Sequence, residues 1–424
     1  MLEEALAPFH SRKISPFAIA LSGGGDSMAL LQALKNAPRL NCALIVDHGL
    51  REASAAEANL TKKRAEALGV SAHILSWKPN SLKSGLQEKA RKARYSLMGD
   101  FCRSKQIPLL LTAHHQDDQA ETLVMRYEKG TDWRGAAGMS PENYAPLWPQ
   151  LAEVTLCRPL LTVSKAEILK YLDSHGVVWV EDPSNANRDF ARVRIRQSLV
   201  ASPKFIGPLL DAAKDLQIAK SKERRILAEQ ADHILSLDTN GSAIISEIPY
   251  PQLLVHLVRI VSGTGGPIDQ AKIRRALEKM RAPEFEALTL AGAQVSKVEN
   301  GFLLCRDAVA VKGRQNKKQT IHNEQPLPLG VPYIWDGRFT ALATSDDIKA
   351  TPLYGHMSEL PKNLANDVKK YPPAARITLP LWHNRAGILG IGEGEFDGLT
   401  VRCLAKQRLD AALEKKVPFY AKIV

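Results

Sequence analysis

A glycine-rich segment near the N-terminus, Ser22-Gly-Gly-Gly-Asp-Ser27, has the composition of a phosphate-binding loop. Consecutive glycines let backbone N–H groups approach a ligand, and the N-terminus of a following helix attracts negative charge. The loop lacks the Gly-Lys-Ser/Thr ending of a P-loop and the G-x-G-x-x-G spacing of a dinucleotide-binding fold. It holds Asp26, which would repel a phosphate unless Mg²⁺ lay between them. The segment therefore predicts a phosphate or pyrophosphate site with Asp26 as a metal ligand; an ordinary glycine-rich turn is the alternative.

A second group of polar residues lies between Ala113 and Arg126, where a predicted strand runs into a helix. Asp118 and Glu121 are three residues apart and would project together from the first turn of that helix. They could ligate Mg²⁺, bind the ammonium group of an amine substrate, or simply complement the helix dipole. The neighbouring histidines, His114 and His115, do not predict a zinc site, because adjacent residues at a strand end point in different directions.

Further polar residues follow the apolar segment Cys42 to Val46, where Asp47, His48 and Arg51 would stand at the end of a strand. Ligands of a doubly wound sheet bind outside the carboxyl ends of its strands. These three side chains would therefore face the same crevice as the glycine loop, although Arg51 could equally be a solvated loop charge.

Arginines gather on two later segments. The helix predicted to begin at Gly85 carries Arg91 and Arg94, which could contact a nucleotide or an RNA phosphate. They could also form a solvated basic face paired with Glu88. A denser cluster, suited to the phosphates of RNA or a nucleotide, consists of Arg188, Arg192, Arg194 and Arg196.

Alternating strand and helix patterns position these groups. Apolar runs at 17–21, 42–46 and 107–112 predict buried strands, and residues at helical spacing between them predict crossover helices. The alternation predicts an α/β fold with a doubly wound, mostly parallel sheet. The carboxyl edge of that sheet would bring the glycine loop, Asp47 and the acidic cluster together.

The composition limits the class of protein. A chain of 424 residues is long enough for two or three domains, and its 45% apolar and 24% charged content is typical of a soluble globular protein. The formal charge of +12 suggests a polyanionic partner. The five widely spaced cysteines are expected to be reduced core residues. No leader and no apolar stretch long enough to span a bilayer is visible, so we expect a cytoplasmic protein without membrane association.

The order of these patterns predicts the domain organisation. Residues 1–200 would form the α/β domain, and residues 201–312 a small α+β domain with two strands joined at Glu299-Asn-Gly301. A polar linker would cover 313–329. Short β-like runs with glycine turns predict a small β-rich C-terminal domain over 330–424.

The motifs of the first 200 residues together resemble the tRNA(Ile)-lysidine synthetase family of the PP-loop ATP pyrophosphatase superfamily. The glycine loop matches the Ser-Gly-Gly-x-Asp-Ser pattern of that superfamily. One departure is Val193, where the family commonly has asparagine. The other motifs are Val46-Asp-His-Gly-Leu-Arg51, Gln87-Glu-Lys-Ala-Arg-Lys-Ala-Arg-Tyr95, Ala113-His-His-Gln-Asp-Asp-Gln-Ala-Glu-Thr122, Arg158-Pro-Leu-Leu161 and Glu181-Asp-Pro-Ser-Asn185 with its arginine tail.

The resemblance implies a two-step reaction on the wobble cytidine of an isoleucine tRNA with the anticodon CAU. The C2 oxygen of the cytidine would attack the α-phosphate of ATP and release pyrophosphate. The ε-amine of L-lysine would then displace AMP to give lysidine, which changes decoding from AUG to AUA. ATP, Mg²⁺, L-lysine and this tRNA are the implied ligands, and no stable protein partner is implied.

The same resemblance assigns roles to the candidate residues. Asp26 and Asp118 would bind Mg²⁺, and Arg192 or Arg196 would offset charge at the α-phosphate. The catalytic group would be Asp26, Asp118, Glu121 and Arg192. The tRNA would contact Arg94, Arg188, Arg194 and Arg196. The nucleotide would contact Ser22, Gly23, Gly24, Gly25, Asp26, Ser27, Asp47, His48 and Arg91.

Three other activities fit parts of the pattern. A tRNA thiolase of the same superfamily is the main alternative, but it needs cysteines for a cluster or a persulfide, and the cysteines here are isolated. A small-molecule synthetase would need an ammonia-producing domain. A nucleotide-sensing RNA-binding protein without turnover would keep the glycine loop but would not need Asp118, Glu121 and the arginines.

Overall fold

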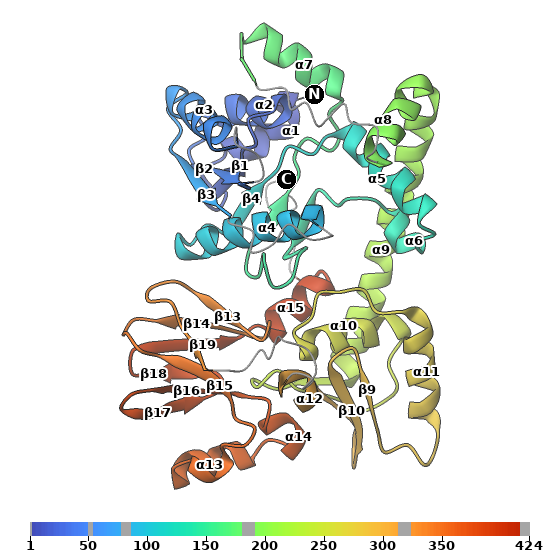
Figure 1. The fold of residues 1–424 in the computed structure, drawn as a ribbon. Coiled ribbons are helices and arrows are strands. Elements are labelled where there is room, and N and C mark those ends of the chain that lie inside the picture. Colours follow the sequence, from blue (N-terminus) through green and yellow to red (C-terminus); the bar gives the residue numbers. More distant parts are fainter. Residues whose placement is uncertain (1, 50–53, 78–85, 180–190, 313–323, 416–424) are drawn as a thin grey trace. The chain divides into compact units, whose positions relative to one another are not determined.

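The computed structural model describes residues 2–49, 54–77, 86–179, 191–312 and 324–415 (Figure 1). The chain divides into two compact units, and the boundary between residues 223 and 224 lies inside helix α9 (Ile206–Ile234). The first unit contains the glycine loop and all the candidate site residues. We describe each unit by itself.

A six-stranded sheet forms the centre of the first unit, with the strand order β3-β2-β1-β4-β6-β5. All neighbouring strands are parallel except β5 and β6, which are antiparallel. The doubly wound, mostly parallel fold predicted from the sequence is therefore confirmed. Its strands are β1 (Phe17–Ala20), β2 (Leu40–Asp47), β3 (Ala72–Ser76), β4 (Leu109–Leu111), β5 (Glu142–Tyr144) and β6 (Thr155–Cys157).

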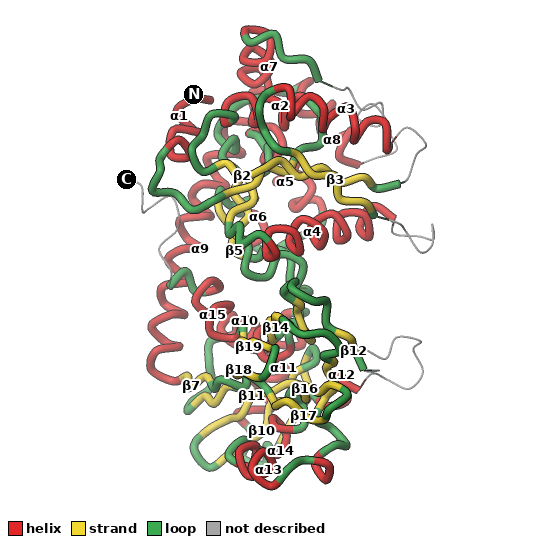
Figure 2. The backbone as a smooth tube through the Cα atoms, turned by 90° about the vertical axis from the view of Figure 1, so that its left-hand side faces the viewer, coloured by secondary structure: helices red, strands yellow, loops and turns green. Residues whose placement is uncertain are grey.

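Alternation along the strands divides the buried side chains between two cores, because successive residues of a strand face opposite sides of the sheet. Phe17 and Ile19 pack on one side, whereas Ala18 packs on the other with Tyr95 and Met98 of α4. Figure 2 shows α2 and α4 on opposite sides of the strands. The first side is covered by α1 (Leu2–Leu6), α2 (Gly25–Leu34), α3 (Ser54–Ala67) and α7 (Lys165–Ser174), and the second by α4 (Leu86–Ser104).

The remaining helices of this unit are α5 (Gln116–Glu128), α6 (Trp133–Ala136), α8 (Ala191–Ala201) and the first part of α9. The sequence predicts one continuous helical pattern from residue 189 to 235, but the chain breaks it with a 3₁₀ turn at Pro203–Phe205. Proline lacks a backbone N–H and starts a new turn more readily than it continues a helix. The strand predicted at 177–180 is absent over its described residues, 177–179.

The second unit begins with an antiparallel sheet in the order β7-β8-β11-β10-β9. Helices α10 (Pro251–Ser262) and α11 (Gln270–Arg281) pack on it, and the buried Leu409 of α15 (Ala405–Ala412) belongs to the same core. The predicted strand pair around Glu299-Asn-Gly301 is the β10–β11 hairpin. The strands are β7 (Leu235–Leu237), β8 (Ala243–Ile245), β9 (Ala287–Leu290), β10 (Ala293–Val298) and β11 (Gly301–Arg306).

Two four-stranded sheets, β12-β15-β16-β17 and β13-β14-β19-β18, make the C-terminal region β-rich, as predicted. Trp335 of one sheet and Trp382 of the other meet in a shared core, with ring centroids 6.4 Å apart. The strands are β12 (Gln325–Pro326), β13 (Tyr333–Trp335), β14 (Phe339–Ala343), β15 (Lys349–Pro352), β16 (Pro380–Asn384), β17 (Gly387–Ile391), β18 (Gly394–Phe396) and β19 (Leu399–Cys403). The short helices beside them are α12 (Ala308–Lys312), α13 (Lys362–Lys369) and α14 (Pro373–Arg376).

All five cysteines are free, and four of them are buried. Burial raises the pKa of the Cys42 and Cys102 thiols to about 12 and that of Cys305 to about 11. These thiols therefore stay protonated near neutral pH, as expected for core residues. Within the described ranges, no helix is both long and apolar enough to cross a membrane.

Candidate active site

The glycine loop joins β1 to α2 and is closed by its own serines. Ser27 Oγ accepts a hydrogen bond from the Ser22 N–H over 3.2 Å and donates one to the Gly24 carbonyl over 3.0 Å. Gly23 has φ +84°, and a Cβ there would lie 2.4 Å from Thr61 Oγ1 of α3. Only glycine fits this turn, so the backbone itself forms the surface offered to a ligand.

Helix α7 packs directly against the start of α2. A Cβ at Gly25 would lie 3.2 Å from Leu172 Cδ1 of α7, so a side chain there would require the leucine to shift. At the other end of α7, Lys165 Nζ lies 2.5 Å from Asp26 Oδ1. The backbone N–H of Lys165 donates to Asp117 Oδ2 over 2.9 Å. The capping-box motif predicted where α7 begins, but the contact of its lysine with the loop was not predicted.

His115 connects three carboxylates at the end of β4. Its Nε2 lies 3.7 Å from Asp26 Oδ2 and 3.4 Å from Asp118 Oδ2, and its Nδ1 lies 3.4 Å from Asp117 Oδ2. Burial lowers the pKa of the imidazole, but the contact with Asp117 and the charges of Asp118 and Asp26 outweigh burial and raise it. Asp26 and Asp118, both predicted to bind Mg²⁺, thus converge on one nitrogen atom.

Two arginines of α8 hold the acidic pair of α5. Arg192 donates from Nε to Glu121 Oε2 over 2.5 Å and from Nη2 to Asp118 Oδ1 over 2.6 Å. Arg196 donates from Nε to Glu121 Oε1 over 2.6 Å, and this hydrogen bond raises the pKa of its guanidinium. The Glu121 side chain is 1% exposed, whereas those of Arg192 and Arg196 are 42% and 43% exposed. Three predicted catalytic residues therefore form one cluster: Asp118, Glu121 and Arg192. We call these three residues and Arg196 the acidic clamp.

A positively charged group surrounds His114, whose Nδ1 lies 2.9 Å from Thr112 Oγ1. Burial and the charges of Arg158, Arg192, Arg91 and Arg94 lower the pKa of His114 to about 3. The imidazole is therefore neutral near neutral pH, chiefly because it is buried, and the arginine charges act in the same direction. Arginines near this position could contact phosphate groups.

The side chains of Arg91 and Arg94 lie over the ring of the buried Tyr95, with Cζ to centroid distances of 5.1 and 5.3 Å. Glu88 pairs with Lys92 at 2.8 Å. The partner of Glu88 is therefore a neighbouring lysine and not one of these arginines. Arg91 and Arg94 thus belong to the positive group around His114.

Asp47 and His48 follow β2 as predicted. Asp47 Oδ1 accepts hydrogen bonds from Ser54 Oγ and from the Gly49 N–H, and these bonds lower the pKa of the carboxyl group. The His48 ring meets Trp77 edge-on at 6.2 Å. Its Nδ1 is buried and has no hydrogen-bond partner among the residues that the structure describes. Asp47 therefore shapes the turn, while His48 keeps a free polar atom.

These features fit a nucleotide. The glycine loop offers backbone amides at a helix N-terminus, and the unpartnered His48 nitrogen offers a further polar contact. The described part of the chain contains no group of three or more His, Cys, Asp or Glu side chains that could hold a metal by itself. Mg²⁺ in phosphate sites commonly uses only one or two carboxylates together with the phosphates, and Asp26 and Asp118 meet that need.

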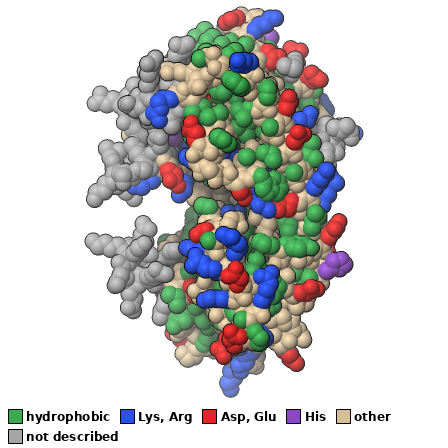
Figure 3. All heavy atoms as spheres, turned by 90° about the vertical axis from the view of Figure 1, so that its right-hand side faces the viewer, with side chains coloured by type: hydrophobic (Ala, Val, Ile, Leu, Met, Phe, Trp, Pro, Cys, Tyr) green, Lys and Arg blue, Asp and Glu red, His purple; other side chains and the backbone are tan. Residues whose placement is uncertain are grey.

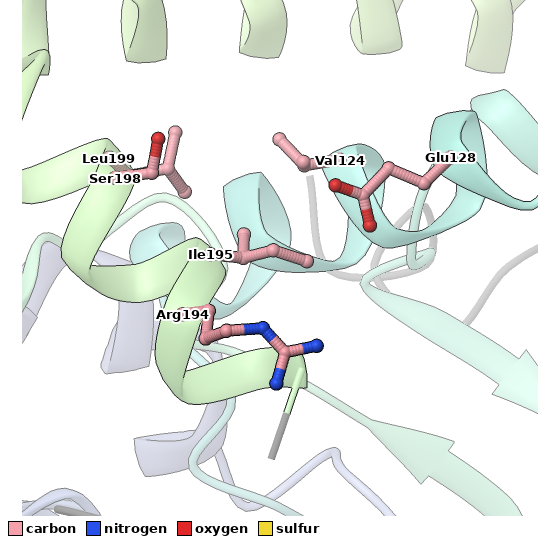
Figure 4. Close-up of a pocket in the computed structure, with 6 residues that line it drawn as sticks. All are labelled: Val124, Glu128, Arg194, Ile195, Ser198 and Leu199. Atoms are coloured by element: carbon pink, nitrogen blue, oxygen red, sulfur yellow. The ribbon is translucent and has the colours of Figure 1, made fainter. Parts of the chain in front are cut away.

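Other predicted residues lie apart from this site or outside the described ranges. Arg188, Arg51 and the segment 181–185 lie outside the described residues. Arg194 is exposed and lines a pocket of about 260 Å³ between α5 and α8 (Figure 4). The other residues that line the pocket are Val124, Glu128, Ile195, Ser198 and Leu199.

The face of the molecule in Figure 3 carries basic, acidic and apolar side chains interspersed with one another.

Comparison with known proteins decides the family. Residues 1–202 match the PP-loop domain. A tRNA(Ile)-lysidine synthase of Novosphingobium aromaticivorans is 39% identical over 284 residues, which cover 65% of this chain and 84% of that protein. A tRNA(Ile)-lysidine synthase of Caulobacter vibrioides is 29% identical over 413 residues, which cover 94% and 93%. The chain belongs to the tRNA(Ile)-lysidine synthase family.

Membership of this family confirms the predicted fold and the use of ATP by a PP-loop enzyme. A U34-tRNA thiolase from Methanococcus maripaludis, solved with its [4Fe-4S] cluster, aligns with a TM-score of 0.42 and 16% identity, covering 51% of this chain and 78% of that one. The predicted alternative of thiolation is not supported, because the relatives that cover most of the chain are lysidine synthases.

Two residues of the site escaped the sequence analysis as functional groups. Lys165 reaches Asp26, and His115 connects Asp26, Asp117 and Asp118. The sequence holds no specific signal for Lys165, because a lysine at the start of a helix is an ordinary feature. For His115, three aspartates predicted at one sheet edge imply a nearby positive partner.

Proposed function

We propose that this protein ligates L-lysine to C2 of the wobble cytidine of tRNA(Ile) with the anticodon CAU, using ATP and producing lysidine. The observation that carries the proposal is the acidic clamp beside the glycine loop: Asp118 and Asp26 approach the same His115 nitrogen. Family membership supplies the reaction, and the residues below supply its chemistry.

In the first step, the C2 oxygen of the cytidine attacks the α-phosphate of ATP and pyrophosphate leaves. The backbone amides of the glycine loop hold the leaving group at the N-terminus of α2. Asp26 and Asp118 would hold Mg²⁺, which would supply neutralisation of phosphate charge. Arg192, whose guanidinium is 42% exposed, turns from the clamp to the α-phosphate and offsets the charge that develops there.

In the second step, the ε-amine of lysine displaces AMP from the adenylated cytidine. Once Arg192 has turned to the phosphate, Glu121 Oε2 is released and can accept a hydrogen bond from an ammonium group of lysine. Arg196 remains on Glu121 Oε1 and keeps that buried carboxylate compensated. The acidic clamp therefore sets the order of the two steps, because lysine can bind there only after Arg192 has turned to the α-phosphate.

The positive group around His114 and the exposed Arg194 give the anticodon region of the tRNA a basic surface. We assign catalysis to residues 1–200 and further tRNA contacts to the α+β region 201–312 and the β-rich region 330–424. The predicted linker 313–329 is shorter at its end, because β12 (Gln325–Pro326) pairs with β15 in the C-terminal sheet.

The test follows pyrophosphate and AMP release by the full chain with ATP, Mg²⁺, L-lysine and a tRNA(Ile) transcript carrying CAU. Sustained release of both products should require tRNA and lysine together, because the adenylated cytidine must be discharged before the next turnover. A single-turnover reaction without lysine should release pyrophosphate but little AMP. Sustained ATP cleavage that ignores lysine would contradict the proposal.

A further inference from the structure

A lysine from a distant helix reaches the phosphate loop of this protein. Lys165 is 139 residues from Asp26 in the chain, and its Nζ lies 2.5 Å from Asp26 Oδ1. In a P-loop, a lysine within the loop contacts the β- and γ-phosphates, but the loop Ser22 to Ser27 has no lysine. Lys165 therefore puts a positive charge where the loop itself has none.

The start of α7 is fixed in place around Lys165. Ser164 caps the helix, with its N–H donating to Glu167 Oε2 over 2.9 Å. The next N–H, that of Lys165, donates to Asp117 Oδ2. Near the other end of the helix, Leu172 is fully buried in the core on the same side of the sheet, so α7 is held at both ends. The Lys165 backbone is anchored while its side chain points toward the loop.

The ion pair itself is poor as a purely structural contact. The side chains of Lys165 and Asp26 are 38% and 32% exposed, and ion pairs this exposed contribute little to stability. A lysine on a flexible stem can leave such a partner readily for a more highly charged one. A triphosphate or pyrophosphate on the adjacent amides is such a partner.

We propose that Lys165 binds the β- and γ-phosphates of ATP and then the leaving pyrophosphate, and that its pair with Asp26 is the arrangement adopted without nucleotide. The inference rests on the proposed function and adds a residue to the site. When Lys165 turns to the phosphates, Asp26 loses its partner and becomes available to Mg²⁺. The ion pair thus keeps the Lys165 ammonium and the Asp26 carboxylate beside each other until ATP and Mg²⁺ bind.

The experiment measures equilibrium binding of ATP, AMP and pyrophosphate to the full chain in the presence of Mg²⁺. The variants are Lys165→Ala, Lys165→Arg and, as a matched control, Lys170→Ala, which removes an exposed lysine of the same helix. Alanine keeps the backbone N–H that binds Asp117, so the start of α7 is retained. Circular dichroism and thermal unfolding check that each variant is folded.

Lys165→Ala should weaken binding of ATP and of pyrophosphate about tenfold or more, because a charge-assisted phosphate contact is lost. AMP has no β- or γ-phosphate, so its affinity should change less than about twofold, and Lys165→Arg should recover most of the loss. Lys170→Ala should bind all three ligands like the parent.

Two results would overturn the assignment of Lys165. One is unchanged ATP and pyrophosphate binding by Lys165→Ala, and the other is an equal loss for AMP and ATP, which would indicate a general distortion of the loop. Failure of the unsubstituted chain to bind ATP would instead contradict the proposed function. The pyrophosphate titrations would still decide the role of Lys165.

Discussion

Two regions of this molecule contain the same chemical group, one carboxylate held by two arginines. In the first unit, Glu121 binds Arg192 and Arg196; in the second, Asp336 binds Arg306 and Arg338. The carboxylates are similarly enclosed, with side chains 1% and 3% exposed. The arginines differ: those on Glu121 are 42% and 43% exposed, whereas those on Asp336 are 6% and 2% exposed.

This difference separates a group that can rearrange from one that cannot. Arg338 is enclosed between the rings of Trp335 and Phe339 and also bonds to Thr378, so no phosphate or substrate can reach it without unfolding. Arg192 has one side in solvent and can exchange partners at little cost. We therefore expect the clamp on Glu121 to serve activity and the cluster on Asp336 to serve stability.

The largest effect should come from Asp26→Ala. Removing the proposed Mg²⁺ ligand should lower the adenylation rate about 1,000-fold, equal to about 4 kcal/mol, because phosphate charge is no longer neutralised. Affinity for tRNA should remain within about twofold, since phosphate contacts of the RNA lie on the arginines. Single-turnover pyrophosphate release and filter binding measure the two quantities. Equal rates in the variant and the parent would rule out the metal role.

Asp336→Asn should give the next largest effect, on stability alone. Asparagine keeps the shape and tolerates the φ of +48° at this position, but it leaves two buried guanidinium groups without a countercharge. The free energy of unfolding should fall by about 3 kcal/mol. Denaturant unfolding measures this loss, and the rate per folded molecule should not change. A variant that is as stable as the parent but adenylates more slowly would show that the cluster on Asp336 serves activity and not stability.

Arg192→Ala should mainly lower activity, whereas Asp336→Asn should lower stability. The adenylation rate should fall about 100-fold, because one charge at the α-phosphate is lost. The free energy of unfolding should fall by less than it does in Asp336→Asn, since Arg196 still compensates Glu121. Arg192→Lys should not restore the rate, because an ammonium cannot bind two oxygens in a fork. A loss of stability as large as that of Asp336→Asn would show that the exposed clamp is structural.

The smallest effect concerns the pH dependence of stability. Because the pKa of His115 is raised above its ordinary value of 6.5, the charged imidazole stabilises the fold fully below that pH. This contribution is lost as the pH rises through the raised pKa. The difference in unfolding free energy between the parent and His115→Gln should therefore shrink as the pH rises from below 6.5 through the raised pKa. His10→Gln, at an exposed position, is the control, and a difference that grows with pH would contradict the assignment.

Local patterns were sufficient to predict much of the first unit. The apolar run before Ser22 and the helical spacing after Ser27 predicted β1, the loop and α2, and the spacing of Asp118 and Glu121 predicted their shared position on α5. These features depend on neighbours in the chain, where strand and helix periodicities are visible.

Contacts between distant segments could not be predicted in the same way. Lys165 has the pattern of an ordinary helix start, and nothing in its neighbourhood in the chain indicates Asp26. Arg192 and Arg196 lie four residues apart on one helix and Asp118 and Glu121 three apart on another, but only packing of α5 against α8 joins the two pairs. The sequence also leaves two roles open for Asp118 and Glu121, binding a metal or binding an ammonium group. The choice depends on the residues that other segments place beside them, which local patterns do not show.

The most direct test of the account is incorporation of labelled lysine into tRNA. The full chain is supplied with ATP, Mg²⁺ and either tRNA(Ile) with the anticodon CAU or the methionine tRNA that shares this anticodon. We expect stable incorporation into tRNA(Ile) alone. Cleavage of ATP to AMP and pyrophosphate with another RNA, without incorporation of lysine into tRNA(Ile), would retain the PP-loop chemistry and contradict the proposed nucleophile.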